Sequence, residues 1–292
     1  MIDPEQVDDG SDAFESARPR LFGVAYRMLG SAAEAEDVVQ DAWLKWQATD
    51  RTSVRSSIAF LTTVTTRLSI NVTQSARVRR ESYVGPWLPE PIDTRADPAL
   101  GAENDAAIEL AVLVVLERIP ARERAAYVLR EAFDYPYGQI ADILETTDAN
   151  ARQLVTRARK HLADTRREPV DSQDHRRLLD AFLAAAQQGD LESLERILAQ
   201  DVVSLSDGGG KVDTAARIPV AGRTRVAAFV AAFSSHFWVG AETRFAEVNG
   251  KAVVLITRDS VVTTMLTIDA SENGIEQVLW VMNPEKLAAL SG

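Results

Sequence analysis

The stretch from Tyr137 to Leu162 constrains the fold more than any other part of this 292-residue chain. It predicts two short helices joined by a polar turn at Glu145–Asp148, whose residue types favour turns and helix caps. In the second predicted helix, apolar residues recur every three or four positions from Ala151 onward, so one stripe of that helix is buried. The opposite face is polar and basic. Its members are Asn150, Arg152, Gln153, Arg157 and Lys160.

These side chains suit contact with nucleic acid. Arginine, asparagine and glutamine can make paired hydrogen bonds to base edges, and lysine can neutralise phosphate. A helix-turn-helix whose second helix carries such a face places that helix in the major groove of DNA. The alternative is an ordinary helical hairpin with a solvated basic face, because cations near a helix end, as in Arg157–Lys160, are also a general stabilising pattern. The rest of the chain decides between the two.

The net charge of −11 opposes DNA binding by the chain alone. Non-specific attraction to DNA is almost wholly between cations and phosphates, so bulk DNA repels a free chain of this charge. Binding to DNA therefore needs local basic patches and a partner that supplies affinity.

Composition limits the remaining classes of protein. The length predicts about two domains, and the apolar fraction of 46% is ample for burying cores. No apolar run reaches the roughly 18–20 residues of a membrane span, and the acidic N-terminal segment does not resemble a signal peptide. The absence of cysteine excludes disulfides, thiol catalysis and zinc–thiolate sites. We expect a cytoplasmic protein without membrane contact, cofactor or metal.

Three helices are predicted ahead of the basic motif. The first covers Phe14–Leu29, and the second covers Ala32–Gln47 after a capping box formed by Ser31 and Glu34. The third covers Ile58–Val72. Each has one apolar face, which predicts a helical domain.

An acidic ridge follows one face of the second predicted helix. Asp37 and Asp41 are one turn apart, and Gln40 lies beside them. Such a ridge is most often only a solvated face. The functional alternative is a docking surface for a basic partner helix.

A proline-rich segment follows the third helix. The prolines of Gly85–Pro91 remove hydrogen-bond donors and hold the backbone extended, so this segment is not a helix. It opens a linker that runs to about Leu100. Because Trp87 and Leu88 lie between prolines, we expect the segment to pack onto another surface. Helical patterns resume from Ala106 and lead into the opening motif.

In this order and spacing, these features resemble the extracytoplasmic-function (group IV) sigma factors of bacterial RNA polymerase. The segments that carry the resemblance are AEAEDVVQDAWLKW (33–46), FLTTVTTRLSI (60–70) with RVRR (77–80), and LERIPARERAAYVLREAFDYPYGQIADIL (116–144) with ARQLVTRARKHL (151–162). They are similar, respectively, to the core-binding helix of region 2, to the −10-recognising part of region 2, and to region 4 from end to end.

The resemblance implies partners and site residues. The residues expected to bind the large subunits of core RNA polymerase are Asp37, Gln40, Asp41 and Trp43. Those expected to bind the melted −10 element are Arg67, Asn71, Arg77, Arg79 and Arg80, with a flipped base in the loop 48–57. The five polar residues of the helix-turn-helix are expected to read the −35 duplex. Polymerase then supplies most of the DNA affinity, which reconciles DNA binding with the negative charge.

Two places depart from the family pattern. Glu145 stands where the family usually has a turn glycine, so either a non-glycine backbone takes that bend or the turn differs. Arg67, Asn71 and Gln74 stand where the family more often has Asn, Asp and Arg, so these three match in position and not in residue type.

The chain continues well beyond Leu162 with a pattern of helices followed by strands. The predicted helices are Leu178–Gln187, Leu191–Leu198 and Arg223–Phe237, and the predicted strands are Val202–Leu205, Thr243–Val248, Ala252–Arg258, Val261–Ile268 and Ile275–Val281, with turns at Asn249–Gly250 and Asn273–Gly274. Helices followed by a curled antiparallel sheet make an α+β cone. With Trp87–Pro91, Asp207–Lys211 and Asn283–Leu287, this order resembles the sigma group that carries a SnoaL-like, NTF2-like domain in cis.

We therefore expect a multidomain chain of two all-α sigma domains and a C-terminal α+β cone. The expected boundaries are 11–84 for region 2, 85–105 for the linker, 106–167 for region 4 and 172–290 for the C-terminal domain. The expected function is promoter-specific transcription initiation with core RNA polymerase, without enzymatic activity or catalytic residues. The C-terminal domain is expected to fold back on region 2 and the linker, to set the spacing between regions 2 and 4, and so to regulate the factor in cis. The docking residues would be Trp87, Leu88, Pro89, Asp207, Lys211, Asn283, Pro284 and Lys286.

Two other functions stay open. The C-terminal domain could be a small-ligand sensor or an enzyme coupled to transcription, with Asp207 and His236 as its candidate pocket residues. Gly208–Gly210 could cradle a phosphate, but the triplet lacks the strand–loop–helix context of such a site, which favours a turn or a docking loop. The chain could also be a promoter-binding regulator without sigma activity.

Overall fold

The computed structural model of the protein describes residues 10–93, 109–165 and 167–290, apart from the side chains of residues 76–79. Residues 1–9 of the acidic N-terminal segment and the later part of the predicted linker lie outside these residues. The chain forms two compact units that alternate along the sequence. The helical unit comprises Met1–Arg77, Pro98–Ala107 and Leu116–His161, and the sheet unit comprises Val78–Asp97, Ile108–Val115 and Leu162–Gly292.

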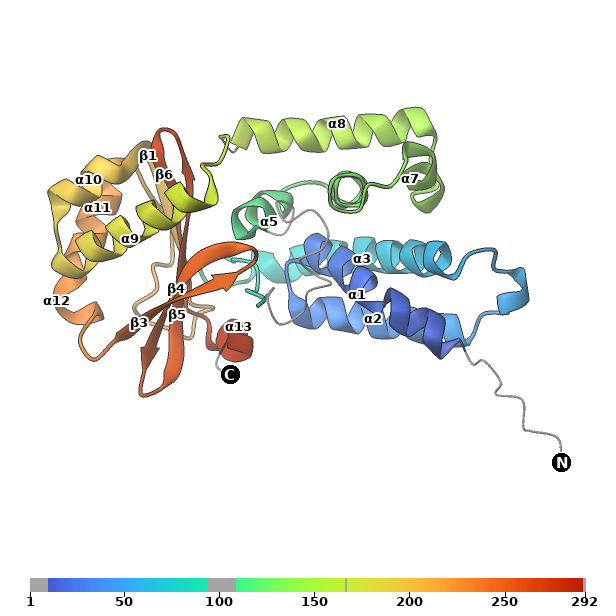
Figure 1. The fold of residues 1–292 in the computed structure, drawn as a ribbon, viewed down its shortest axis with the longest axis horizontal. Coiled ribbons are helices and arrows are strands. Elements are labelled where there is room, and N and C mark those ends of the chain that lie inside the picture. The colour runs from blue at the N-terminus through green and yellow to red at the C-terminus, as the bar shows by residue number, and fades with distance from the viewer. Residues whose placement is uncertain (1–9, 94–108, 166, 291–292) are drawn as a thin grey trace. The chain divides into compact units, whose positions relative to one another are not determined.

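The helical unit contains the three predicted N-terminal helices and the predicted helix-turn-helix (Figure 1). Its helices are α1 (Ser11–Leu29), α2 (Ala32–Gln47), α3 (Ser57–Glu81), α6 (Ala121–Tyr127), α7 (Tyr137–Ile143) and α8 (Asp148–Thr165), with a 3-10 turn at Arg51–Ser53 and a π-helical turn at Val128–Ala132. The predicted caps are present. Gly30 ends α1 with a φ of 65°, and the Ser31 hydroxyl accepts the Glu34 N–H at the start of α2.

A buried arginine joins the N-terminal helices to the helix-turn-helix part of this unit. The Arg124 side chain is 2% exposed and donates to the carbonyls of Met28 at 2.5 Å and Glu117 at 2.7 Å. Its guanidinium also lies 3.2 Å from the Glu117 carboxylate. Burial lowers the pKa of Arg124 to about 10. The carbonyls and the carboxylate compensate the loss of water around this cation, so the two parts share one core.

The sheet unit is a six-stranded sheet with helices (Figure 1). Its strands are β1 (Leu198–Asp207), β2 (Val220–Ala221), β3 (Glu242–Val248), β4 (Lys251–Arg258), β5 (Val261–Ser271) and β6 (Gly274–Val281), in the spatial order β2-β1-β6-β5-β4-β3. Its helices are α5 (Leu110–Leu116), α9 (Ser172–Gln188), α10 (Leu191–Ile197), α11 (Arg223–Ala232), α12 (Ser234–Phe237) and α13 (Pro284–Leu287), followed by a 3-10 turn at Ala288–Leu290.

One expectation for this sheet is wrong. The sheet is mixed rather than antiparallel, because β1 pairs with β6 in parallel. The chain passes from β1 through β2, α11 and α12 into a run of four antiparallel strands, β3 to β6, and β6 lies beside β1 in the same direction. The predicted helix Arg223–Phe237 is also two helices, which meet at Phe233. The predicted turn at Asn249–Gly250 is confirmed, with φ angles of 53° and 68° as expected for a two-residue hairpin turn.

Both faces of the sheet are covered. Successive residues of β4 alternate between the faces: Val254 and Ile256 belong to one apolar cluster, and Val253 and Leu255 belong to the other. Helices α9 to α11 complete the first cluster. The second is completed by Leu287 and Leu290, which follow β6, and by Leu88, Leu110 and Val114, which are far away in sequence. Residues from the predicted linker and from the start of region 4 are therefore part of the core of the sheet unit.

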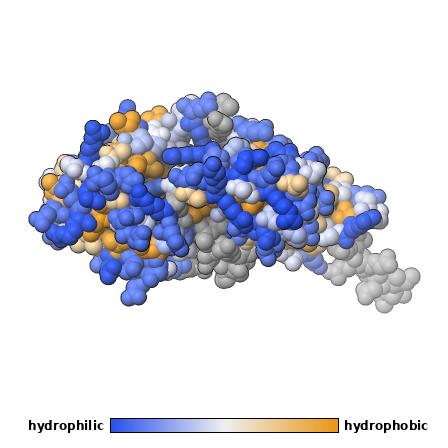
Figure 2. Space-filling model, turned by 90° about the horizontal axis from the view of Figure 1, so that it is seen from above, coloured by the Kyte–Doolittle hydropathy of each residue, from blue (hydrophilic) through white to orange (hydrophobic). Residues whose placement is uncertain are grey.

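The face of the molecule shown in Figure 2 is mostly hydrophilic, and its hydrophobic residues lie in small separate areas. The most exposed large apolar side chains among the described residues include Leu44, Ile218, Val239 and Val261. Isolated apolar side chains are ordinary on protein surfaces. Among these four, only Leu44 adjoins a predicted functional surface.

Candidate functional site

A fully buried carboxylate, that of Asp207 at the end of β1, organises the contacts between the linker and the sheet. Its Oδ1 accepts the Tyr83 hydroxyl at 2.6 Å, and its Oδ2 accepts the Leu88 N–H at 2.8 Å and the Lys286 ammonium at 2.7 Å. Burial, and then the hydrogen bond to Asp207, raise the pKa of the Tyr83 phenol, which stays protonated and donates. A buried carboxylate is stable only with such donors, and two of the three come from the segment 83–92, which spans the end of region 2 and the start of the linker.

Lys286 makes further contacts with the linker. Its ammonium also donates to the Leu88 carbonyl and lies 4.2 Å from the centroid of the Trp87 ring. The Arg80 guanidinium lies 3.6 Å from the same centroid. Burial lowers the pKa of Lys286, and the Asp207 carboxylate opposes that shift. Two cations therefore contact the Trp87 ring, and one of them is paired inside the site.

Asn283 positions Lys286 within this site. The Asn283 Oδ1 accepts the Glu285 N–H and so caps α13, in which Pro284 occupies the first turn. The Asn283 amide nitrogen donates to the Tyr83 hydroxyl at 2.9 Å. Lys211 forms an ion pair with Glu285 at the exposed edge of the site.

The glycines of the predicted docking loop permit a close approach of the linker. Gly209 has a φ of 58°, and a Cβ atom at this position would lie 2.5 Å from the Asn283 amide nitrogen and 2.9 Å from the Tyr83 hydroxyl. Gly210 has a φ of 73°, and its Cβ would lie 3.1 Å from a Val84 side-chain atom. The left-handed backbone conformation therefore favours glycine at both positions, and the available space also favours glycine at Gly209.

A second contact lies farther along the linker. The Ile92 N–H donates to the Asn249 side-chain oxygen at 3.1 Å, and the Asn249 N–H donates to the Ile92 carbonyl at 3.1 Å. Lys251 lies 3.1 Å from the carboxylate of Glu109, just ahead of α5. We call the set of residues that bind the segment 83–92 the linker seat. Its members are Asp207, Gly209, Gly210, Asn249, Asn283 and Lys286.

The acidic ridge lies on the exposed side of α2. Asp37, Gln40 and Asp41 are all exposed. Leu44, one turn beyond Gln40, is 58% exposed and extends the ridge with an apolar residue. Trp43 is half-buried against the Phe14 ring, with the ring centroids 4.8 Å apart. The ridge therefore offers two carboxylates and an apolar side chain on consecutive turns of one helix.

The residues predicted for −10 recognition do not form one free surface. Asn71 is exposed, whereas the side chains of Arg77 and Arg79 lie outside the described residues. Arg67 donates to the Ile143 carbonyl at 2.9 Å in the turn between α7 and α8. Arg80 stacks on Trp87.

The polar face of α8 is largely exposed. Arg152, Gln153 and Lys160 point to solvent. The Arg152 guanidinium donates to the Asp148 carboxylate at 2.9 Å and lies 4.4 Å from the Tyr137 ring centroid. The remaining two residues have internal partners: Asn150 donates to Thr146, and Arg157 pairs with Glu123 at 2.7 Å.

Comparisons with known proteins identify the family. The Sigma-70 region 2 family model matches residues 13–81, and the Sigma-70, region 4 model matches residues 109–162. The ECF RNA polymerase sigma factor SigJ of Mycobacterium tuberculosis is 39% identical over 249 residues, which cover 82% of this chain and 78% of the relative. The chain belongs to the extracytoplasmic-function sigma factors.

The probable ECF RNA polymerase sigma factor SigI of the same organism is 32% identical over 235 residues, covering 79% of each chain. The crystal structure of M. tuberculosis SigJ matches with a TM-score of 0.75 at 31% identity, covering 96% of this chain and 98% of that one.

Family membership settles the principal function. This sigma factor directs promoter-specific transcription initiation, and the relatives are sigma factors rather than enzymes. The predicted fold class, two helical sigma regions followed by an α+β domain, is confirmed. Among the described residues, no helix is both long enough and apolar enough to cross a membrane.

The alternative pocket residues of the sigma factor have separate partners. Asp207 is buried in the linker seat and bound to the segment 83–92, whereas His236 is exposed and hydrogen-bonded to Ser235. An aromatic cavity lies between the sheet and helices α11 and α12. Its lining includes Phe229, Phe233, Phe237, Trp238, Trp280 and Met282. The volume of about 30 Å³ holds about one water molecule, so an organic ligand would require repacking of these rings.

Sequence reasoning missed several members of the linker contact. Tyr83 was not singled out, although a tyrosine four residues before a tryptophan flanked by prolines marks the same apolar segment. Asn249 was predicted only as a turn residue. Its second role depends on Ile92, which is 157 positions away in sequence. A single sequence carries no signal for such a distant pairing.

Proposed function

We propose that the C-terminal domain regulates this sigma factor in cis by holding the segment that joins regions 2 and 4 in the linker seat. The factor binds core RNA polymerase through the acidic ridge of α2, extended by Leu44. It binds the melted −10 element through α3 and the −35 duplex through the exposed face of α8. The C-terminal domain then controls how freely the two DNA-binding regions can be arranged on a promoter.

The buried Asp207 carboxylate carries this proposal. Release of the segment 83–92 would remove the Tyr83 hydroxyl and the Leu88 N–H and leave the carboxylate with Lys286. An incompletely paired buried charge costs several kcal/mol. In addition, the linker is tethered to its seat, which gives it an effective concentration on the order of mM. The linker therefore occupies its seat in the free chain, and polymerase or a signal has to release or rearrange it.

The contacts of Arg67 and Arg80 support the same conclusion. Both arginines are predicted to bind −10 DNA, and both have protein partners, in the α7–α8 turn and on Trp87, respectively. If these arginines contact DNA, their present contacts have to open. A change in the linker seat is then coupled to −10 binding through Arg80.

Run-off transcription with purified core RNA polymerase tests the proposal. The template is a promoter selected with the wild-type holoenzyme from a random library. The variant is Asp207→Asn with Lys286→Met, which removes both charges of the pair and leaves no isolated ion in the core. The control is Lys211→Ala, which removes only an exposed ion pair at the edge of the same site.

We expect the double variant to change the transcript yield at least severalfold and to alter the fluorescence of Trp87, with the Trp87→Phe chain as the blank. Lys211→Ala should match the wild type. Wild-type yield together with unchanged Trp87 fluorescence in the double variant would show that the domain does not regulate through this seat.

A further inference from the structure

An arginine lies on each side of the buried apolar stripe of α8, the second helix of the helix-turn-helix. Because successive residues of an α-helix are rotated by about 100°, the side chains of Arg157 and Arg159 leave the helix on opposite sides of Ala158, which is fully buried. Gln153 and Lys160 belong to the face opposite the stripe and are exposed. The two arginines therefore lie at the borders between the buried face of α8 and the face predicted to read the −35 duplex.

Each of these arginines has a carboxylate partner in the helical stretch that precedes the helix-turn-helix. The Arg157 Nε donates to the Glu123 carboxylate of α6 at 2.7 Å. The Arg159 guanidinium donates at 2.6 Å to the carboxylate of Glu131, in the π-helical turn that continues α6. One helical stretch thus contacts α8 on both sides of its apolar stripe. We call Glu123–Arg157 and Glu131–Arg159 the flanking pairs.

The π-helical turn at Val128–Ala132 helps to bring the two glutamates to one face. Glu123 and Glu131 are eight positions apart, and eight residues of a regular α-helix leave an offset of about 80° between side chains. A π-helical turn has i→i+5 hydrogen bonds and so holds more residues per turn, which reduces this offset. The local backbone therefore favours the presentation of both carboxylates to α8.

Glu123 holds Arg157 on the protein. The Glu123 side chain is 12% exposed, and its second oxygen lies 3.7 Å from the Nε2 of His161, one turn after Arg157. That oxygen is buried and has no hydrogen-bond partner among the described residues. Moving Arg157 to a DNA phosphate would separate a mostly buried carboxylate from its charged partner, which is strongly unfavourable. Arg157 is therefore better suited to bracing α8 than to binding phosphate.

The second flanking pair lies on the same side of α8 as Arg152. Arg159 follows Arg152 by seven positions, or about two turns, so the two side chains leave the helix in nearly the same direction. The Arg152 guanidinium lies 4.4 Å from the centroid of the Tyr137 ring in α7. A rotation of α8 about its own axis, in either sense, would lengthen at least one flanking pair and would move Arg152 away from this position.

Stability accounts poorly for the Glu131–Arg159 pair. The two side chains are 27% and 51% exposed, respectively, and exposed ion pairs contribute little to stability. The planar guanidinium of an arginine makes directional hydrogen bonds to a carboxylate, so such a pair is well suited to fixing orientation. A phosphate contact is the other role open to an exposed arginine beside DNA.

We infer that Glu123 and Glu131 are positioning residues for −35 recognition: the flanking pairs fix the rotation of α8 about its own axis and so determine which of its polar side chains face the bases. This inference rests on the proposed function, because it takes the exposed face of α8 as the reader of the −35 duplex.

Binding of the reconstituted holoenzyme to a set of promoters tests the inference. The templates are the promoter selected with the wild-type holoenzyme and its single-base variants in the −35 element. The readout is the −35 preference, the ratio of the affinities for the selected and the variant promoters. The variants are Glu131→Ala, Arg159→Ala and the charge swap of Glu131→Arg with Arg159→Glu. The control is the charge swap of Glu192→Arg with Arg196→Glu, an exposed pair within α10 of the C-terminal domain.

We expect Glu131→Ala and Arg159→Ala each to lower the −35 preference about threefold, the size expected for loss of one partly exposed ion pair. The charge swap of this pair should restore the wild-type preference, because it forms the pair again with opposite polarity. Its affinity should fall on every promoter, since a carboxylate replaces a cation near the DNA, and the ratio is insensitive to that uniform loss. The control swap in α10 should retain the wild-type preference.

The Glu123–Arg157 pair needs a different variant, because its carboxylate is mostly buried. Glu123→Gln combined with Arg157→Met removes both charges and leaves no isolated ion in the helical unit. This chain should also lose about threefold in −35 preference. Urea unfolding of the same chain reports its stability separately.

Two outcomes would overturn the inference. One is the wild-type −35 preference in both Glu131→Ala and the Glu123→Gln, Arg157→Met chain. The other is a charge-swapped chain whose preference stays at that of Arg159→Ala. A salt slope reduced by about one in Arg159→Ala would then identify Arg159 as a phosphate ligand.

The proposed function fails separately. If α8 does not read the −35 duplex, Arg152→Ala also leaves the −35 preference unchanged. Regulation through the linker seat is judged by the transcript yield and Trp87 fluorescence of the Asp207→Asn, Lys286→Met chain on the selected promoter.

Discussion

The guanidinium of Arg67 in α3 lies 2.9 Å from the carboxylate of Glu145 in the turn between α7 and α8. Both residues stand where this chain departs from the pattern of its family, and the structure brings them together. Arg67 also donates to the carbonyl of Ile143, at the end of α7. A side chain of region 2 thus satisfies the carbonyl end of a region 4 helix, as cations near helix C-termini commonly do.

The backbone of Glu145 leads to the first prediction. Its φ is 49°, so a non-glycine residue does take the left-handed bend. Glu145→Gly and Glu145→Ala both lose the carboxylate, and they differ in the strain of this bend. We expect the glycine variant to unfold in urea with a free energy about 1 kcal/mol higher than the alanine variant. Equal stability would show that the turn stores no strain.

The second prediction concerns the acidic ridge. Asp37→Arg or Asp41→Arg should abolish holoenzyme formation in gel filtration, because a cation opposed to a basic partner costs up to several kcal/mol at a docked interface. Leu44→Ala should weaken the complex without lowering the unfolding free energy, since this side chain is 58% exposed. Asp180→Arg, an exposed aspartate in α9, is the charge-matched control. Normal complexes from the ridge variants would refute the assignment.

The third prediction separates base contacts from phosphate contacts on α8. Arg152→Ala should lose about 1–3 kcal/mol of −35 affinity and relax the base preference. Lys160→Ala should weaken all sequences alike and reduce the salt slope by about one. The measurement is holoenzyme binding to promoter variants at several salt concentrations. A uniform loss in Arg152→Ala would reverse the assignment of roles.

Local features of the sequence were sufficient to predict most helices, the capping of α2 and the turn at Asn249–Gly250. Each depends on neighbours within a few positions, such as Ser31 with Glu34. The polar segments around Asp207 and Asn283 were also recognisable, because turn-forming residues gather at strand ends. In these places local preference and tertiary structure agree.

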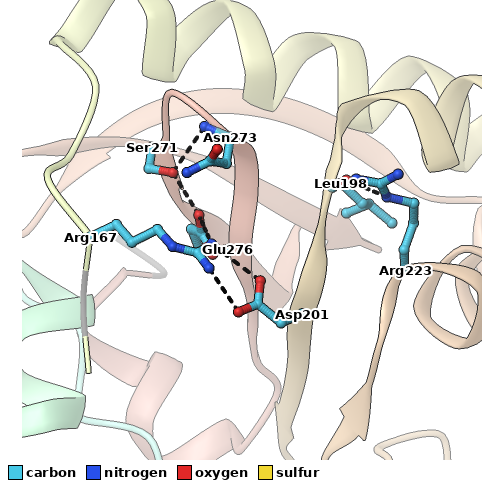
Figure 3. A network of polar contacts seen from close by, with 7 residues as sticks. All are labelled: Arg167, Leu198, Asp201, Arg223, Ser271, Asn273 and Glu276. Atoms are coloured by element: carbon cyan, nitrogen blue, oxygen red, sulfur yellow. Dashed lines mark hydrogen bonds and ion pairs between the residues drawn. The ribbon is translucent and has the colours of Figure 1, made fainter. Parts of the chain in front are cut away.

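The structural features that the sequence did not predict involve partners far apart in sequence. Parallel pairing of β1 with β6 depends on topology and leaves no periodic signal in either strand. The start of region 4 has the sequence pattern of an ordinary helix, yet its Leu110 and Val114 cover the sheet of the C-terminal domain. Arg167 lies in a stretch where the sequence shows only a change of composition, whereas its hydrogen bonds join it to Asp201 and Glu276, far along the chain (Figure 3).

The fourth prediction is a pH dependence centred on His175, a residue 3% exposed whose Nε2 lies 3.1 Å from the Ile268 carbonyl. Its Nδ1 has no hydrogen-bond partner among the described residues. Burial lowers the pKa of His175; the hydrogen bond to Ile268 opposes this shift, and the charge of Lys251 adds to it. The unfolded chain therefore binds more protons than the folded chain below a pH of about 6.5.

It follows that the contribution of His175 to stability is complete above pH 6.5 or so and is lost as the pH falls below it. Urea unfolding at pH 7.5 and pH 5.5 should show a smaller loss of stability in His175→Gln than in the wild type. His236→Gln, which changes an exposed histidine of the same domain, should behave as the wild type. An unchanged pH dependence in His175→Gln would contradict the prediction.

The last prediction concerns the dependence of the C-terminal domain on the linker. Leu88 is fully buried in the apolar cluster that also contains Val253, Leu255 and Met265 of the sheet. Leu88→Ala in the full chain should cost about 3–5 kcal/mol of stability, as for other buried leucines. The control is Leu44→Ala, which makes the same substitution at an exposed leucine. A fragment of residues 172–290 lacks Leu88, Leu110 and Val114, so Leu287 and Leu290 alone are left to cover the second face of its sheet. We expect this fragment to unfold at lower urea than the full chain or to self-associate in gel filtration. A monomeric fragment as stable as the full chain would mean that the linker lies on the domain without contributing to its core.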